Sequence, residues 1–276
     1  MKTIAVPWAL RLIQGLDFPN KLGICERLFG SALAKHGICW APTAAGLPWK
    51  LDLRNATLRW TVYGKYEGAP FLDWAREFLR PEAVVVDSGA NISQMLLYLA
   101  QWVPNGKVFA IEPGKHQADW LEECLAANPR LPVELIRIGL GAETREAFLE
   151  EPGQEDRHGS WNRISTTDGE RINLVRLDEL LSSRGVARID LWKLDVEGYE
   201  IPALQGAEHL LRDQRIRALY VELDGDNGRA IIRHLAERGY GLHLFKRNGK
   251  LQSAKAMDHE HTYGLFCCAI EGFADR

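Results

Sequence analysis

The stretch V-V-V-D-S-G-A-N-I-S, residues 84–93, decides the fold. Its continuous apolar start predicts a strand that is covered on both faces of a sheet. The acid and the glycine that follow predict a turn at the carboxyl end of this strand, where Gly89 lets the backbone approach a ligand closely. Ligands of open α/β sheets bind at this end of the strands, so the turn marks a candidate ligand site.

From Ala83 onward, apolar runs alternate with helical stretches. We predict strands at 83–86, 107–111, 133–138, 189–194, 218–223, 241–245 and 263–270. We predict helices at 93–102, 115–128, 201–213 and 227–238. This rhythm predicts an α/β fold with a doubly wound, mostly parallel sheet, which we assign to a domain over residues 81–276.

Residues 1–80 are predicted to form a helical and β-hairpin extension that packs on this domain. Helices are expected after Pro7, over 20–36 and over 70–79, and strands at 49–53 and 57–62 around a turn at Arg54-Asn55. The sequence leaves open whether residues 1–60 form a lid, a dimer arm or a membrane-facing surface. A homodimer is compatible with each of these.

The composition is that of an ordinary globular protein. The chain has 276 residues, a net charge of −3 and a pI near 6.3, which argue against a nucleic-acid partner. There is no apolar run of 18 residues, so we expect no integral membrane span. A signal peptide would continue as an apolar run to its cleavage site, whereas Arg11, Gln14 and Asp17 interrupt the run here. We therefore expect no signal peptide. Five cysteines without a C-x-x-C pair predict reduced thiols in a cytoplasmic protein.

Asp87, at the tip of the first strand, bears on which ligand the turn holds. Dinucleotide enzymes place G-x-G-x-x-G here to seat a pyrophosphate, and this chain lacks that pattern. An acid would repel a pyrophosphate, whereas it suits the zwitterionic, phosphate-free methionine tail of S-adenosylmethionine (SAM). The alternative is that Asp87 only orders the turn.

Glu112 ends the second strand, 25 residues after Asp87 (112 − 87). An acid at this position accepts hydrogen bonds from both ribose hydroxyls of an adenosine ligand, and Pro113 fixes the chain behind it. Enzymes that use NAD have the same arrangement, so Glu112 indicates a nucleoside rather than SAM itself. The alternative is a solvated acid at a strand end.

The third candidate is K-L-D-V-E-G-Y-E, residues 193–200, where an apolar strand delivers carboxylates at its carboxyl end. Acids there can position the SAM sulfonium, bind acceptor hydroxyls or act as a base. They can also cap the following helix, because acids stabilise helix N-termini. We favour a functional role for Asp195 and leave both interpretations open for Glu197 and Glu200.

These motifs together resemble the FkbM family of SAM-dependent methyltransferases. The family's D-x-G-A-N-x-G turn corresponds to residues 87–93, and its K-x-D-V-E-G signature is intact at 193–198. Ile111-Glu112-Pro113, Asn128, the L-D-E-L element at 177–180 and the Y-E element at 66–67 also match, so the resemblance covers about residues 47–245.

The resemblance implies a class I methyltransferase fold, a seven-stranded Rossmann-like sheet whose last strand is antiparallel. It also implies methyl transfer from SAM to a hydroxyl oxygen of a sugar, a polyketide or another small molecule. Carried over by position, Asp87, Gly89 and Asn91 belong to the SAM turn and Glu112 to the ribose contact. Asp195 and Glu197 then border the cofactor and the acceptor.

The chain departs from the family pattern at Ser93, where the family has a second glycine. The serine side chain can crowd the methionine tail, or it can N-cap the helix that begins there. A binding or scaffold protein that has lost catalysis is therefore one alternative to the methyltransferase. A nucleotide-dependent oxidoreductase is another, which the missing glycine pattern disfavours.

Three groups are candidates for the base that takes the acceptor's proton. Asp195 is the first, Glu222 with Asp224 on the next strand is the second, and His158 on the loop 158–163 is the third. Asp195, Glu222 and Asp224 are hard oxygen donors that suit magnesium, but their spacing does not demand an ion, so we predict no metal.

Overall fold

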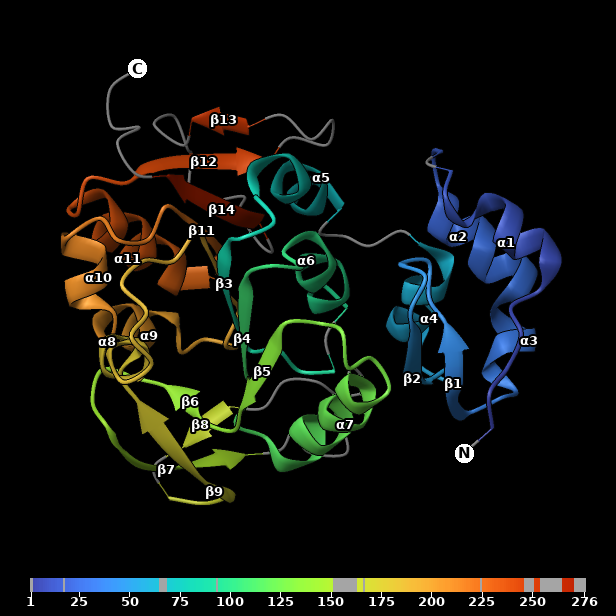
Figure 1. Cartoon of the computed structure of the whole chain (residues 1–276), viewed down its shortest axis with the longest axis horizontal. Helices are drawn as coiled ribbons and strands as arrows, with labels where there is room; N and C mark the ends of the chain where they lie inside the picture. Colours follow the sequence, from blue (N-terminus) through green and yellow to red (C-terminus); the bar gives the residue numbers. More distant parts are fainter. Residues whose placement is uncertain are drawn as a thin grey trace.

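A computed structural model of the chain describes residues 2–16, 18–64, 69–92, 94–150, 163–165, 167–223, 225–245, 251–253 and 265–270. It is an α/β domain with a smaller N-terminal unit at one side (Figure 1). No helix within these ranges is long and apolar enough to cross a membrane.

The central sheet has the strand order β13-β12-β14-β11-β10-β3-β4-β5. The strands are β3 (Val84–Ser88), β4 (Lys107–Ile111), β5 (Val133–Ile136), β10 (Leu191–Leu194), β11 (Ala218–Leu223), β12 (Gly241–Phe245), β13 (Leu251–Ser253) and β14 (Leu265–Ile270). β3, β4, β5, β10 and β11 pair in parallel, and β14 is antiparallel to both β11 and β12. This confirms the predicted class I sheet with its antiparallel last strand. The short strand β13 extends it to eight strands.

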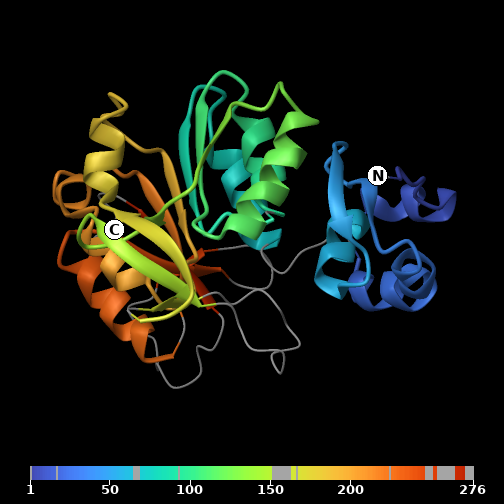
Figure 2. The ribbon, with the colours of Figure 1, turned by 90° about the horizontal axis from the view of Figure 1, so that it is seen from below.

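Helices cover both faces of the sheet because successive residues of its strands point to opposite sides. Val85 and Val108 face a core with α5 (Ala69–Phe78), α6 (Leu96–Trp102) and α7 (Lys115–Ala126). Val86 and Phe109, their neighbours in sequence, face a second core. That core is covered by α8 (Leu177–Ser182), α9 (Glu200–Gln205), α10 (Glu208–Arg212) and α11 (Gly225–Ala236). Figure 2 shows the two groups of helices on opposite sides of the strands.

A four-stranded sheet lies beside the central one and was not predicted. Its order is β6-β9-β7-β8, with β6 (Gly139–Leu140), β7 (Arg145–Glu150), β8 (Arg163–Ser165) and β9 (Glu170–Val175). Ala147 and Leu149 on β7 pack with Ile172 and Leu174 on β9 in a small core of their own. These strands are short and carry many charges, so the sequence showed no clear apolar run.

The N-terminal unit begins with α1 (Trp8–Gln14), α2 (Lys21–Cys25), the π-helical η1 (Glu26–Gly30) and α3 (Ser31–Ala34). The predicted helices after Pro7 and over 20–36 are thereby confirmed. The hairpin is formed by β1 (Ile38–Pro42) and β2 (Pro48–Asp52), and the helix α4 (Ala56–Tyr63) follows it. The prediction of a strand at 57–62 is therefore wrong.

Two polar residues explain why this segment is helical. The side chain of Asn55 accepts a hydrogen bond from the backbone N–H of Thr57 at 2.9 Å and so caps α4. Arg59 is buried, where it donates to the carbonyl oxygen of Leu53 and pairs with Glu26. In an alternating strand Arg59 would lie on the polar face, whereas the structure buries it.

The strand β2 holds this unit against the α/β domain. The indole N–H of Trp49 donates to the carbonyl oxygen of Ile92 at 3.0 Å, next to the turn after β3. On α7, Trp120 donates to the carbonyl oxygen of Lys50 at 2.7 Å, and Glu123 forms an ion pair with the Lys50 side chain. The N-terminal unit therefore contacts the same turn that carries the candidate ligand site.

Candidate functional site at the strand tips

The turn after β3 lies against the end of β10. Gly89 has φ +73°, and a Cβ at this position would lie 1.7 Å from the carbonyl oxygen of Asp195. Asn91 also has a positive φ of 48°, which asparagine tolerates better than most residues. Gly89 thus allows two strand ends to approach each other, in addition to the predicted approach to a ligand.

Lys193 connects these two strand ends and was missed as a site residue. It pairs in register with Asp87, so the two side chains lie on the same face of the sheet. Its Nζ lies 3.2 Å from Asp87 Oδ1 and 3.1 Å from Asp195 Oδ2, and it donates to the Gly89 carbonyl oxygen. A lysine within an apolar strand, two residues before an acid, was the signal available in the sequence.

Glu112 joins the β3 turn to the segment after β4. It is 5% exposed, and its carboxylate accepts from the backbone N–H of Asn91 at 2.7 Å and of Gly114 at 2.9 Å. Burial raises the pKa of Glu112 to about 7, against the opposing effect of these two hydrogen bonds. We call the hydrogen bonds of Glu112 to Asn91 and Gly114 the Glu112 clasp. Pro113, the residue between Glu112 and Gly114, is half-buried.

Three carboxyl groups converge beyond β10 and β11. One oxygen each of Asp195, Glu197 and Glu222 lies within 4.8 Å of the others. Burial and the neighbouring Asp195 charge raise the pKa of Glu222 to about 9. Two predicted base candidates, Asp195 and Glu222, therefore lie side by side, and Glu222 is protonated at neutral pH.

Glu200 has a structural role in the loop between these acids. It is buried, and one carboxylate oxygen accepts from the backbone N–H groups of Val196 and Gly198, both at 3.1 Å. Glu197 and Gly198 have φ values of 52° and 92°, so the loop turns sharply here. These contacts close the loop before α9, whose N-cap residue Tyr199 has no side-chain capping hydrogen bond.

These residues fit SAM in charge and in hydrogen bonding. Asp87, Glu112, Asp195, Glu197 and Glu222 bring more acidic groups to the strand tips than Lys193 offsets, which suits a ligand that carries a sulfonium and an ammonium group. Each oxygen of Glu112 accepts one backbone N–H and retains a further lone pair for a ribose hydroxyl. The three clustered carboxylates are also of the type that holds a hard divalent cation, and the absence of a metal stays a prediction.

Some residues named from the sequence fall outside the described residues. They are Ser93, Asp224, the base candidate His158, Asp17 and the Y-E element at 66–67.

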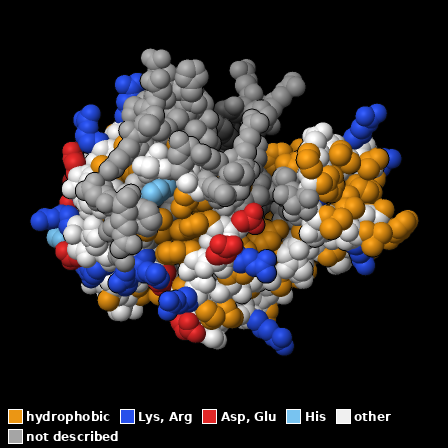
Figure 3. Space-filling model, turned by 90° about the horizontal axis from the view of Figure 1, so that it is seen from above, with side chains coloured by type: hydrophobic (Ala, Val, Ile, Leu, Met, Phe, Trp, Pro, Cys, Tyr) orange, Lys and Arg blue, Asp and Glu red, His pale blue; other side chains and the backbone are white. Residues whose placement is uncertain are grey.

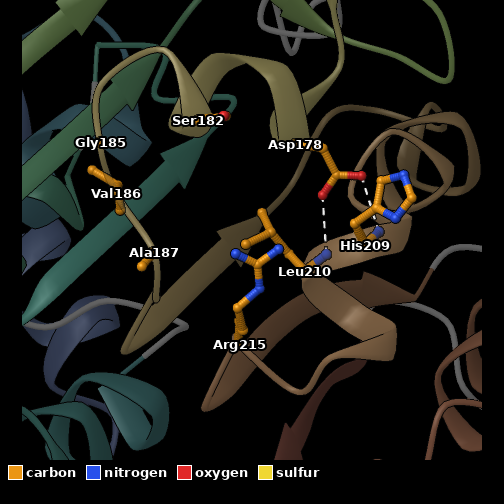
Figure 4. Close-up of a pocket in the computed structure, with 8 residues that line it drawn as sticks. All are labelled: Asp178, Ser182, Gly185, Val186, Ala187, His209, Leu210 and Arg215. Atoms are coloured by element: carbon orange, nitrogen blue, oxygen red, sulfur yellow. Dashed lines mark hydrogen bonds between the residues drawn. The ribbon is translucent and has the colours of Figure 1, made fainter.

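A cavity of about 420 Å³ lies at the opposite, amino-terminal end of the strands (Figure 4). Its lining comes from both ends of α8, from α10 and from the segments that precede β10 and β11. Asp178 points to the start of α10 and accepts from the backbone N–H groups of His209 and Leu210 at 2.9 and 3.0 Å. The cavity is separate from the carboxyl ends of the strands, where the candidate site lies.

Comparison with known proteins decides the family. Residues 87–242 match the model of the methyltransferase FkbM domain. The chain belongs to the FkbM family of SAM-dependent methyltransferases. The match begins at Asp87 and includes the Glu112 clasp, Lys193 and the three clustered carboxylates. It favours the methyltransferase over the oxidoreductase alternative.

Several curated relatives share this domain. AmbE, an antimetabolite synthetase of Pseudomonas aeruginosa, is 32% identical over 240 residues, which cover 72% of this chain and 11% of AmbE. The hexuronic acid methyltransferase AglP of Haloferax volcanii is 28% identical, covering 60% of this chain and 66% of AglP. The 31-O-demethyl-FK506 methyltransferase FkbM of Streptomyces tacrolimicus is also 28% identical, covering 59% and 74%. The chain thus spans about a tenth of AmbE and just under two thirds of AglP.

Proposed function

We propose that this FkbM-family methyltransferase transfers the methyl group of SAM to a hydroxyl oxygen of a small molecule or a sugar. The observation that carries the proposal is the Asp195–Glu222 carboxyl pair, which lies beside the β3 turn. One relative is named for a sugar acid, hexuronic acid, and another for an O-demethylated small molecule, 31-O-demethyl-FK506. An alcohol must lose its proton on methylation, and a carboxyl pair is a suitable recipient.

SAM supplies an electrophilic methyl group on a sulfonium. We assign its binding to Asp87, Gly89, Asn91, Glu112, Pro113 and Glu197. The Glu112 carboxylate would accept from the ribose hydroxyls, while the acids near Lys193 would balance the positive charge of the ligand. The main catalytic effect of such a site is to hold the acceptor oxygen in line with the methyl group. This positioning lowers the activation barrier by roughly 7–11 kcal/mol in favourable cases.

The acceptor's proton passes to the Asp195–Glu222 pair. In the transfer, the acceptor oxygen would bond to the methyl carbon as the carbon–sulfur bond of SAM breaks and S-adenosylhomocysteine leaves. The acceptor's O–H bond would break with it, and its proton would move to a carboxylate oxygen of the pair. Lys193 Nζ lies 3.1 Å from Asp195 Oδ2, and burial raises the pKa of Glu222 to about 9, so Glu222 holds a proton at neutral pH. The pair has to lose this proton before it can accept another, and the rate is expected to rise with pH through the high pKa of Glu222.

The test uses the full chain with SAM that carries a CD₃ group and a panel of acceptors, among them hexuronic acids and polyketide alcohols. We expect a mass gain on an acceptor hydroxyl, a loss of about two orders of magnitude or more in Asp195→Asn, and unchanged turnover in the exposed control Glu82→Gln. Transfer only to nitrogen or sulfur acceptors would contradict the proposal. SAM binding without turnover on any acceptor would favour the scaffold alternative.

The same experiment gives the pH dependence. In the wild type, we expect kcat to rise between pH 7 and 9.5. A Glu222→Gln variant that keeps this rise would show that another group is the base.

We also propose a cytoplasmic location. Cys25, Cys39 and Cys124 are buried and free, as is usual in a reducing compartment. Thiol titration of freshly isolated, denatured protein should find the cysteines reduced.

A further inference from the structure

The first helices of the N-terminal unit carry apolar side chains on their outer face. Trp8, Leu12 and Leu16 recur every four residues along and just beyond α1 and are 76%, 67% and 56% exposed. Such spacing places them on one face. Ile24 and Leu28, also four residues apart, are exposed on α2 and η1.

The opposite faces of these helices are already buried. Leu10 of α1, Cys25 of α2 and Leu33 of α3 belong to the core that continues into the α/β domain. The unit contacts that domain through β2 (Figure 1). The outer apolar side chains therefore remain exposed to solvent in the folded chain. A helix that is apolar on two faces is expected to have something against both of them.

The charge around this face differs from that of the rest of the chain. Residues 1–40 contain five Lys and Arg against two Asp and Glu, a net charge of +3, whereas the whole chain has −3. Exposed arginines directly precede two of the apolar residues, Arg11 before Leu12 and Arg27 before Leu28, and Lys2 and Lys35 are exposed as well. Figure 3 shows the hydrophobic side chains gathered over the N-terminal unit, with basic ones at its edge.

We propose that this face, formed by Trp8, Leu12, Leu16, Ile24 and Leu28, docks on an anionic lipid surface. Helices that lie in a membrane interface bury tryptophan and leucine to the level of the acyl chains and keep arginine and lysine at the headgroups. A second copy of this chain fits less well, because two faces with the same positive charge would then lie against each other. The docking goes beyond methyl transfer and does not depend on it.

The test is sedimentation of the full chain with vesicles in 100 mM salt. We expect binding to vesicles of phosphatidylcholine and phosphatidylglycerol in a 70:30 ratio, and about tenfold or more weaker binding to pure phosphatidylcholine. Trp8→Ser with Leu12→Ser should abolish binding, and Arg11→Gln with Arg27→Gln should weaken it about tenfold on the anionic vesicles only. Arg130→Gln, an exposed charge on the α/β domain, is the matched control and should bind as the wild type does.

Circular dichroism shows whether the variants fold, and light scattering after gel filtration reports their mass. Equal binding to both vesicle types, or no binding to either, would overturn the proposal. If the wild type is instead a dimer that Trp8→Ser with Leu12→Ser converts to monomers, with no vesicle binding, the face binds a second copy and the lipid proposal fails.

Discussion

Glu112 is the residue whose protonation is most informative, because its carboxyl group is buried between two backbone N–H groups. Its pKa of about 7 lies above the ordinary value of 4.5. The stability that its protonated form contributes to the free protein is therefore complete below about pH 4.5 and is lost as the pH rises to about 7. Ribose hydroxyls donate hydrogen bonds and so favour the charged carboxylate.

We therefore predict that S-adenosylhomocysteine binds with release of a proton and that its affinity rises roughly tenfold from pH 6 to pH 8. Calorimetry in two buffers of different ionisation enthalpy measures both. Glu112→Gln should bind weakly at every pH, while the exposed control Glu82→Gln should retain the dependence. A Glu112→Gln variant with wild-type affinity would show that the ribose lies elsewhere.

Lys193 has a different function, since it stabilises buried negative charge. Lys193→Met leaves Asp87, which is fully buried, without this cation. Removing one partner of a buried ion pair costs about 3–5 kcal/mol, so the urea midpoint should fall accordingly. Adding Asp87→Asn to the same chain should recover much of the loss. If the double variant is no more stable than Lys193→Met alone, Asp87 is not what Lys193 stabilises.

At the scale of elements, the β3 turn and the end of β10 form one assembly because Gly89 lies against the Asp195 carbonyl group. We predict that Gly89→Ala separates the β3 turn from the end of β10 and abolishes cofactor binding. The free energy of unfolding should fall by more than the roughly 1–3 kcal/mol that is typical of a strained backbone. Gly185 is the matched control, because its φ of +67° is similar while no atom lies within 4 Å of its Cβ position. Equal effects of the two substitutions in thermal unfolding would show that only backbone strain matters.

The elements that the sequence predicted best are the buried parallel strands. The bounds predicted for β4, β11 and β12 agree with the structure because continuous apolar runs between turns leave little choice. The helix at 201–213 is two helices, α9 and α10, separated at Gly206-Ala207. Gly206 lies against the Gly141 carbonyl oxygen, a tertiary contact that local sequence does not report.

At the scale of the whole molecule, the sheet topology explains which parts of the site could be predicted from the sequence and which could not. Strand ends that carry Asp87, Glu112 and Asp195 meet at one edge of a parallel sheet, and this follows from the order of elements alone. The clasp of Glu112 on Asn91 and the contact of Lys193 with Asp87 depend on the strand register, which a single sequence does not specify.

The central claim is that SAM binds across the tips of β3, β4 and β10. The measurement that tests it most directly is a crystal structure with S-adenosylhomocysteine. We expect both ribose hydroxyls within hydrogen-bond distance of the Glu112 carboxylate and the sulfur facing the Asp195–Glu222 pair. An adenosine that lies away from Glu112, for instance in the cavity beside Asp178, would contradict it.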